Sequence, residues 1–150
     1  MEEKYSLELK PIGIIHSPYR SRREAPRQGR GRKEICQVEV FEEFEQGLTN
    51  IEGFSHIILI YWFHNSRGYS LFVESRGRGV FATRSPDRPS PLGLSVVELV
   101  AREKNVLKVR GLDAIDGTPL LDIKPYIPTL DEKSSVKVGW LEDELRIEED

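Results

Sequence analysis

Cysteine is nearly absent: Cys36 is the one cysteine among 150 residues, so no disulfide can form within the chain. Such sparse use of cysteine is typical of proteins in a reducing compartment. The sequence also lacks an N-terminal run apolar enough for a signal peptide, and its longest apolar run, residues 57–63, has only the length of a strand. These absences predict a cytoplasmic protein with no membrane partner.

Residues that commonly bind metals are few and scattered. His16, His56 and His64 lie far apart in the sequence, and Cys36 has no cysteine nearby. Zinc sites normally show tighter spacing than this. On one straight strand, His56 and His64 would lie about 26 Å apart, too far to share an ion. We therefore predict no metal site.

Charge is distributed unevenly along a chain whose formal net charge is −3. Residues 19–33 hold seven basic residues and one acidic residue, whereas residues 131–150 hold eight acidic and three basic residues. The first segment permits a basic binding face for an anionic partner, although its charges could instead be merely solvated. The second segment predicts an acidic C-terminal tail. The candidates for contacts to an anionic partner, such as the phosphates of an RNA, are four arginines of the first segment and one from a later loop: Arg22, Arg23, Arg30, Arg32 and Arg88.

Short β-rich runs at near-regular spacing dominate the chain. Residues 79–83 (GVFAT) also resemble a strand, and residues 69–74 fit either a helix or a strand. The pattern and length predict a mainly β fold: a single-domain antiparallel β-barrel over residues 1–150 with one or two short helices. Strands are predicted near residues 12–15, 35–41 and 54–64, in a hairpin of residues 94–101 and 105–111, and on both sides of the Asp116–Gly117 turn within residues 112–125, with a short helix at residues 42–48.

A proline-rich stretch at residues 84–95 (RSPDRPSPLGLS) separates two of these runs. Its three prolines fix their own φ angles and remove backbone donors, which predicts a stiff, extended loop. The loop carries Arg84 and Arg88, whose guanidinium groups suit an anion or a planar ligand. The alternative is a surface connection whose arginines are only solvated.

Four stretches occur in order over about residues 10–128: PIGIIHSPY, FSHIILIYWFH, GVFATRSPDRPSPLGLS and LDAIDGTPLLDIKPYIP. Together they resemble the signature of the TsaA-like family, also called the TrmO family. The resemblance implies a β-barrel that uses S-adenosylmethionine to methylate tRNA. The implied target is N6 of the threonylcarbamoyl-modified adenosine just 3′ of the anticodon. Where the family often has Thr, an aromatic residue and Asn in the loop, this sequence has Ser85, Asp87 and Ser90.

The resemblance also implies which residues hold the cofactor, S-adenosylmethionine. Because N6 of adenine is a weak nucleophile, an acceptor for its proton would help, and the catalytic candidates are Tyr126, Asp113, Asp116 and His64. Asp122 and Lys124 have an alternative role as a cross-strand ion pair without a ligand. The implied cofactor-binding residues are Pro26, Arg27, Gln28, His64, Asn65, Arg84, Leu94, Asp122, Ile123, Lys124 and Pro125.

Three functions fit these features. The first is a tRNA (adenine-N6)-methyltransferase with tRNA as partner substrate. The second is a non-catalytic barrel that binds S-adenosylmethionine or RNA, and the third is a methyltransferase with a different substrate. The scattered motif segments and the resemblance also predict a homodimer with the cofactor near the subunit boundary.

Overall fold

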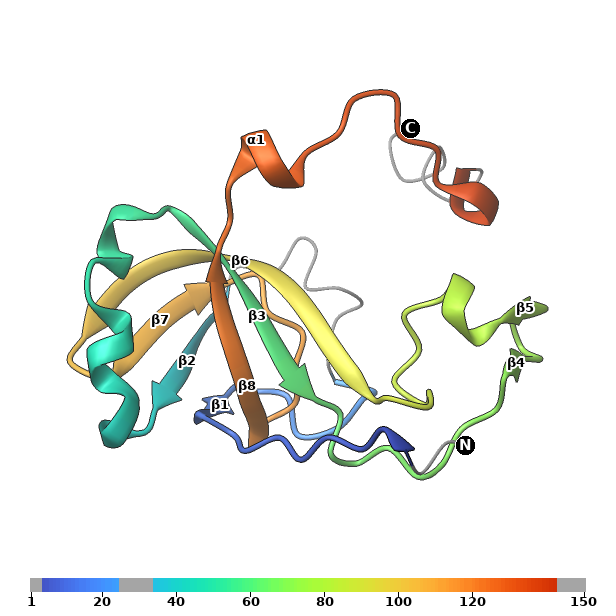
Figure 1. Ribbon diagram of the computed structural model, residues 1–150, viewed down its shortest axis with the longest axis horizontal. Helices are drawn as coiled ribbons and strands as arrows, with labels where there is room; N and C mark the ends of the chain where they lie inside the picture. Colours follow the sequence, from blue (N-terminus) through green and yellow to red (C-terminus); the bar gives the residue numbers. More distant parts are fainter. Residues whose placement is uncertain (1–3, 25–33, 143–150) are drawn as a thin grey trace.

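The computed structural model describes residues 4–24 and 34–142. Within these ranges, six strands close into a barrel in the order β1-β2-β7-β6-β3-β8, and each pair of neighbours is antiparallel (Figure 1). The predicted mainly β, single-domain antiparallel barrel is confirmed. The strands are β1 (Gly13–His16), β2 (Ile35–Val40), β3 (His56–Trp62), β6 (Leu92–Glu103), β7 (Val106–Arg110) and β8 (Thr118–Pro125).

Alternation along the strands builds the core. Ile57, Leu59 and Tyr61 of β3 are at most 2% exposed, while the residues between them lie on the outer face. Leu107 and Val109 of β7 are likewise fully buried. Each such apolar side chain contributes roughly 1.5–3 kcal/mol through burial, so this inward set fixes the register of the sheet.

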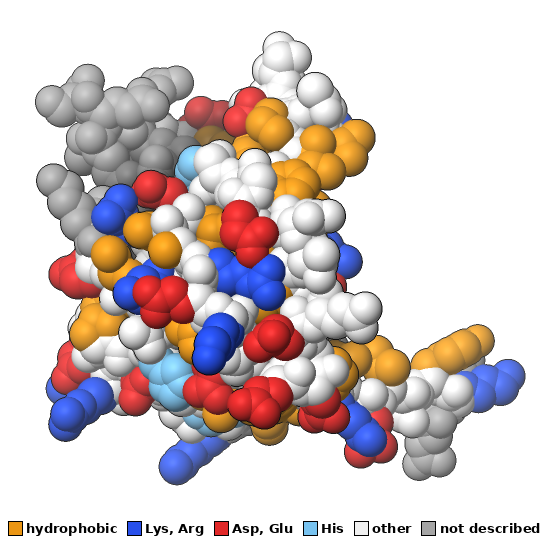
Figure 2. All heavy atoms as spheres, turned by 90° about the vertical axis from the view of Figure 1, so that its left-hand side faces the viewer, with side chains coloured by type: hydrophobic (Ala, Val, Ile, Leu, Met, Phe, Trp, Pro, Cys, Tyr) orange, Lys and Arg blue, Asp and Glu red, His pale blue; other side chains and the backbone are white. Residues whose placement is uncertain are grey.

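Two 3-10 helices, η3 (Glu42–Leu48) and η4 (Ile51–Gly53), cover one end of the barrel. The short helix predicted at residues 42–48 therefore forms, with 3-10 geometry. Leu48 is 3% exposed and joins the core. Residues 42–53 contain four glutamates and no basic residue. Figure 2 views the molecule from this side and shows acidic, basic and apolar side chains intermingled over the surface.

An arm, residues 67–83, leaves the barrel after β3 and projects to the right in Figure 1. It contains β4 (Phe72–Val73), β5 (Arg78–Gly79) and the 3-10 helix η5 (Val80–Ala82). The strand predicted at residues 79–83 is wrong beyond Gly79. The Thr83 amide donates to the Val80 carbonyl at 3.1 Å, which turns the chain instead of extending it.

The strand predicted before the Asp116–Gly117 turn is also wrong, since only β8 after the turn pairs within the sheet. Leu112 and Ala114 are buried, which gives the segment a strand-like pattern. However, the Ala114 carbonyl accepts from the Ser17 hydroxyl at 2.7 Å rather than from a neighbouring strand. The turn itself forms, with Gly117 at φ 83°.

After β8 the chain runs through the short helix α1 (Pro128–Asp131) to the 3-10 helix η6 (Gly139–Leu141). The Trp140 indole donates to the Ala82 carbonyl at 2.7 Å, so this C-terminal segment is tied to the arm. Among the described residues, no helix has the length and apolar content needed to span a membrane.

Candidate functional site

Segments that are far apart in the sequence meet where β3 ends and β6 begins. The Phe63 amide donates to the Pro91 carbonyl at 2.8 Å, directly after the pairing of the two strands. His64 and Asn65 therefore lie beside the proline loop, residues 84–91. Two of the predicted ligand-binding segments are thus brought together at one mouth of the barrel.

The proline loop is held by its own arginine. Arg88 donates from Nη1 to the Thr83 carbonyl at 2.9 Å and to the Ser85 carbonyl at 3.1 Å. The predicted RNA contact Arg88 therefore also stabilises the loop that carries it.

Asp87 joins the loop to its surroundings. Its carboxylate accepts two bonds from the Arg22 guanidinium, at 2.8 and 3.1 Å, and one from the Ser66 hydroxyl at 3.0 Å. The Arg22 hydrogen bonds lower the pKa of Asp87, and the Ser66 bond lowers it further. Asp87, which stands where the family often has an aromatic residue, thus holds Arg22, one of the predicted RNA contacts, beside the loop.

Three predicted cofactor residues lie together on the outer face of the barrel, across β6, β3 and β8. Ile60 of β3 pairs with Leu94 on one side and with Asp122 on the other. Directly opposite residues of an antiparallel pair project from the same face. Lys124 lies in the next row, beside Ile58. An apolar surface with one acidic and one basic side chain at its edge results.

Asp122 and Lys124 contact each other along one strand. Lys124 Nζ lies 3.0 Å from Asp122 Oδ2, and both side chains are about half exposed, at 59% and 47%. The expectation of a cross-strand pair is therefore wrong, because both residues belong to β8. An exposed ion pair of this kind is worth about 0–1 kcal/mol, so it can yield to a ligand at small cost.

His64 supplies a polar atom without a partner. Its Nδ1 is buried and makes no hydrogen bond to any described residue. A buried polar atom left in this state costs about 1–3 kcal/mol, so a bound molecule that pairs with it would be stabilised. Arg84 belongs to the same mouth, since its charge acts on the Tyr61 hydroxyl.

These residues fit the cofactor that the resemblance implies. S-adenosylmethionine carries an ammonium and a carboxylate, which suit Asp122 and Arg84, and hydrogen-bonding groups that suit His64. Its apolar surfaces suit Leu94 and Ile60. The remaining predicted contacts Pro26, Arg27 and Gln28, and the predicted RNA contacts Arg30 and Arg32, lie outside the described residues.

Inside the barrel at this mouth, three side chains form a hydrogen-bonded cluster. The Tyr61 hydroxyl donates to Asp113 Oδ1 at 2.9 Å and lies 2.7 Å from the Ser95 hydroxyl, which itself lies 3.1 Å from Asp113 Oδ1. Burial raises the pKa of Tyr61, and the Asp113 charge raises it further. The hydroxyl is therefore kept as a donor. Asp113 is fixed in position by two groups from the core.

Sequence reasoning missed Tyr61 and Ser95. The signal in the sequence was their position along the strands. Ser95 lies two residues before Val97, and Tyr61 lies two residues after Leu59. Both polar side chains therefore point to the same inner face as these buried apolar residues. Gly93 makes room for this arrangement. A β-carbon added there would lie 2.3 Å from Tyr61 Cε2, which no real contact permits.

The catalytic candidates do not all lie at one place. Tyr126 lies at the start of β3, where its amide donates to the His56 carbonyl at 3.2 Å and its hydroxyl donates to Glu132 at 2.8 Å. Tyr61 lies five positions after His56 along β3, a distance of about 16 Å. Of these candidates, Asp113 therefore shares the mouth with His64, and Tyr126 does not.

Asp116 lies on the turn that precedes β8, beside the end of β1. Its Oδ1 accepts from the Ser17 amide at 3.0 Å and lies 3.9 Å from His16 Nδ1. These contacts give Asp116 a structural role in closing the turn. In the described parts of the chain, no group of His, Cys, Asp and Glu side chains could hold a metal ion.

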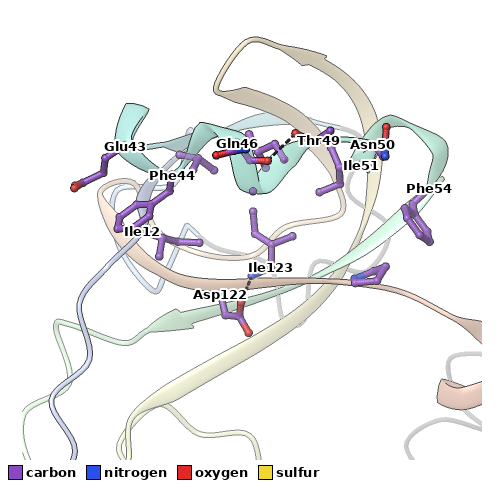
Figure 3. Close-up of a pocket in the computed structure, with 14 residues that line it drawn as sticks. Ile12, Glu43, Phe44, Gln46, Thr49, Asn50, Ile51, Phe54, Asp122 and Ile123 are labelled. Carbon is purple, nitrogen blue, oxygen red and sulfur yellow. Dashed lines mark hydrogen bonds between the residues drawn. The ribbon is translucent and has the colours of Figure 1, made fainter.

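A cavity of about 700 Å³ lies between β8 and the η3–η4 cap, and the predicted cofactor residues Asp122 and Ile123 both line it (Figure 3). Ile123 points toward the cap in this view, whereas Asp122 points away from it. Consecutive residues of β8 thus serve different faces: Ile123 packs in the barrel end and Asp122 faces the outer surface. Pro125 also lines the cavity.

Comparisons with known proteins show which family the chain resembles. The family model described as the tRNA-methyltransferase O N-terminal domain matches residues 14–132. A probable S-adenosyl-L-methionine-binding protein of Pyrococcus abyssi is 54% identical over 138 residues, covering 89% of this chain and 75% of its own. The tRNA (adenine(37)-N6)-methyltransferase of Escherichia coli is 36% identical over 138 residues, covering 82% of this chain and 59% of the relative.

Two further matches show how the lengths compare. A probable S-adenosyl-L-methionine-binding protein of Archaeoglobus fulgidus is 50% identical over 91% of this chain, which spans only 38% of that relative. The crystal structure of TrmO from Pseudomonas aeruginosa superposes with a TM-score of 0.80 at 35% identity, covering 91% of this chain and 63% of that one. The family match covers well over half of the chain. The chain therefore belongs to the family of the tRNA-methyltransferase O N-terminal domain, as the TsaA-like signature in its sequence predicted.

Proposed function

We propose that this protein binds S-adenosylmethionine and transfers its methyl group to N6 of the threonylcarbamoyl-modified adenosine next to the anticodon of tRNA. One observation carries the proposal. The fold gathers residues from four distant segments, including His64, Arg84, Leu94 and Asp122, around one mouth and the outer face beside it. The names of the relatives support both the cofactor and the reaction.

In this proposal each residue has a distinct task. Asp122 accepts from the cofactor's ammonium or hydroxyl groups, Arg84 pairs with its carboxylate, and His64 Nδ1 pairs with a polar group of the nucleoside. Leu94 and Ile60 form an apolar floor. When bound, the cofactor supplies an activated methyl group, so the protein chiefly orients donor and acceptor.

Asp113 is the preferred proton acceptor among the four candidates. N6 gains a methyl group and loses a proton, and a carboxylate fixed by Tyr61 and Ser95 is ready to receive that proton. Tyr126 is not preferred because it lies at the other end of β3. Tyr61 is not the acceptor because burial and the Asp113 charge keep its hydroxyl protonated.

The competing functions differ in measurable ways. A non-catalytic barrel would bind the cofactor without consuming it, and an enzyme with another substrate would methylate something other than tRNA. The tRNA substrate is favoured by the names of the methyltransferase relatives. A tRNA substrate would also place the protein in the cytoplasm.

We also propose a homodimer with the cofactor near the subunit boundary. The face that carries Leu94 also exposes Trp62, Leu92 and Val96, which are 40–45% accessible. An apolar sheet face beside a ligand is suited to cover by a second copy. Sedimentation should show a dimer at micromolar concentration, and Val96→Glu should shift it to monomer. A wild-type protein that is only monomeric and fully active would contradict this.

Calorimetry with S-adenosylmethionine tests the site directly. Asp122→Ala removes a charge-assisted hydrogen bond worth about 1.5–3 kcal/mol, which weakens binding roughly 10- to 100-fold. Glu103→Ala is the matched control, because Glu103 is also an exposed strand carboxylate beside a lysine, with Lys108 at 3.6 Å. Equal affinity in both variants would remove Asp122 from the site.

A further inference from the structure

Three aromatic side chains are exposed on the arm. Phe81 is 73% exposed, Tyr69 60% and Phe72 52%. Leu71, between two of them, is 62% exposed. Clustered apolar exposure of this kind marks a surface that binds something.

The backbone of the arm brings the segments that carry these rings side by side. Phe72 pairs with Gly79, and the Val80 amide donates to the Leu71 carbonyl at 2.8 Å, which continues the ladder by one step. Phe81 therefore follows Val80 opposite the segment that carries Tyr69. The rings belong to one short hairpin and its base.

The arm is held in place before any partner binds. Arg78 stacks on the Trp140 ring at 4.2 Å from its centroid, and Arg76 lies at 5.6 Å. The Trp140 indole is bonded to Ala82, and Val80 is 1% exposed. A preformed surface loses less conformational entropy on binding than a loose one.

The charge of the arm favours an anionic partner. Residues 67–83 contain three arginines, Arg67, Arg76 and Arg78, against one glutamate, Glu74. The opposite end of the barrel, which faces the viewer in Figure 2, carries the four glutamates of η3 and η4. Exposed aromatic rings among arginines are the arrangement that binds unpaired nucleic-acid bases.

We propose that the arm is the docking surface for unpaired bases of an RNA loop. The rings of Tyr69, Phe72 and Phe81 stack on the bases. The arginines of the arm, Arg67, Arg76 and Arg78, attract the phosphates. The arm leads directly into the proline loop, so RNA held there lies next to the mouth that carries His64 and Arg84. The inference rests on the proposed function and adds the element that grips its substrate.

Binding of an anticodon stem–loop RNA, measured by fluorescence anisotropy at fixed salt, tests this surface. A duplex that repeats the stem without a loop is the comparison probe. Phe81→Ala and Tyr69→Ala should each weaken stem–loop binding on the order of tenfold, with duplex binding and cofactor affinity unchanged. Phe81→Tyr, which keeps a ring, should retain binding. Phe54→Ala is the matched control, because Phe54 is 40% exposed beside the acidic cap.

The outcomes separate this inference from the proposed function. Wild-type binding that neither alanine variant weakens beyond Phe54→Ala overturns the role of the arm and leaves the methyltransferase proposal standing. Variants that keep their RNA affinity but lose a dimer in sedimentation show that the arm contacts a second copy, which also overturns it. A wild-type protein that binds neither RNA probe overturns both proposals.

Discussion

Replacing Tyr61 by phenylalanine removes one hydroxyl from the buried cluster and leaves the ring in place. That hydroxyl donates to Asp113 at 2.9 Å, and a hydrogen bond to a charged group contributes about 1.5–3 kcal/mol. Ser95 still reaches Asp113, so the carboxylate keeps one partner. We expect the free energy of unfolding to fall by about 2 kcal/mol and the melting temperature by roughly 4–8 °C.

Urea unfolding followed by circular dichroism measures this change, with the m-value expected to stay constant. Tyr126→Phe is the matched control: its hydroxyl also donates to a carboxylate, Glu132, but on the surface. Its unfolding free energy should stay within error of the wild type. If the two variants behave alike, the Tyr61 cluster does not stabilise the mouth and the argument for a fixed Asp113 fails.

The same variant has a predicted pH dependence. The pKa of Tyr61 is raised from its ordinary value of 10.0, first by burial and then by the Asp113 charge. The neutral hydroxyl is therefore favoured in the folded state. The contribution of the neutral Tyr61 hydroxyl to the stability of the fold is fully present below pH 10.0 and is lost as pH rises through the folded-state pKa. The stability difference between wild type and Tyr61→Phe should accordingly shrink at high pH.

Two further predictions concern other parts of the chain. Burial raises the pKa of Cys36 from 9.0 to about 11, aided by the charge of Glu34, so the native thiol should react with a disulfide reagent at neutral pH far more slowly than the urea-unfolded thiol. The stabilising contribution of the neutral thiol should be lost as pH rises from 9.0 toward 11. Fast reaction of the native protein would contradict this prediction. Replacing both Arg22 and Arg23 by alanine should weaken tRNA binding and reduce its salt dependence by roughly one to two units of slope, whereas a wild-type slope would remove this segment from the RNA surface.

The core strands were predictable from their apolar content. β2 carries apolar residues at every second position, β3 is an almost continuous apolar run, and the turn at Lys104 joins two β-rich runs into the β6–β7 hairpin. The pairing of the strands, in contrast, was not predictable from the sequence. β3 lies between β6 and β8, and nothing local in the sequence specifies those long-range neighbours.

The errors have a common physical origin. Residues 112–114 alternate in burial as a strand would, but their partners are the side chain of Ser17 and the barrel interior. Residues 80–82 are β-prone, yet hydrogen bonds at Val80 turn the chain there. Local patterns report which side chains are buried and do not report which backbone groups lie opposite.

For the site, the resemblance supplied residues and the structure supplied their arrangement. Leu94 and Asp122 become neighbours only through Ile60, a residue with no chemical signal of its own. The roles of Tyr61 and Ser95 depend on meeting Asp113 from a distant loop. Such a cluster requires the closed barrel, so sequence parity alone could not have shown it.

Methyl transfer to tRNA is the most direct test of the central proposal. The purified protein is incubated with labelled S-adenosylmethionine and total tRNA from a strain that lacks this methylation, and the nucleosides are then separated. We predict label in the N6-methylated threonylcarbamoyladenosine, with less in the Asp122→Ala reaction. Cofactor binding without any label in tRNA would contradict the account and favour the non-catalytic barrel.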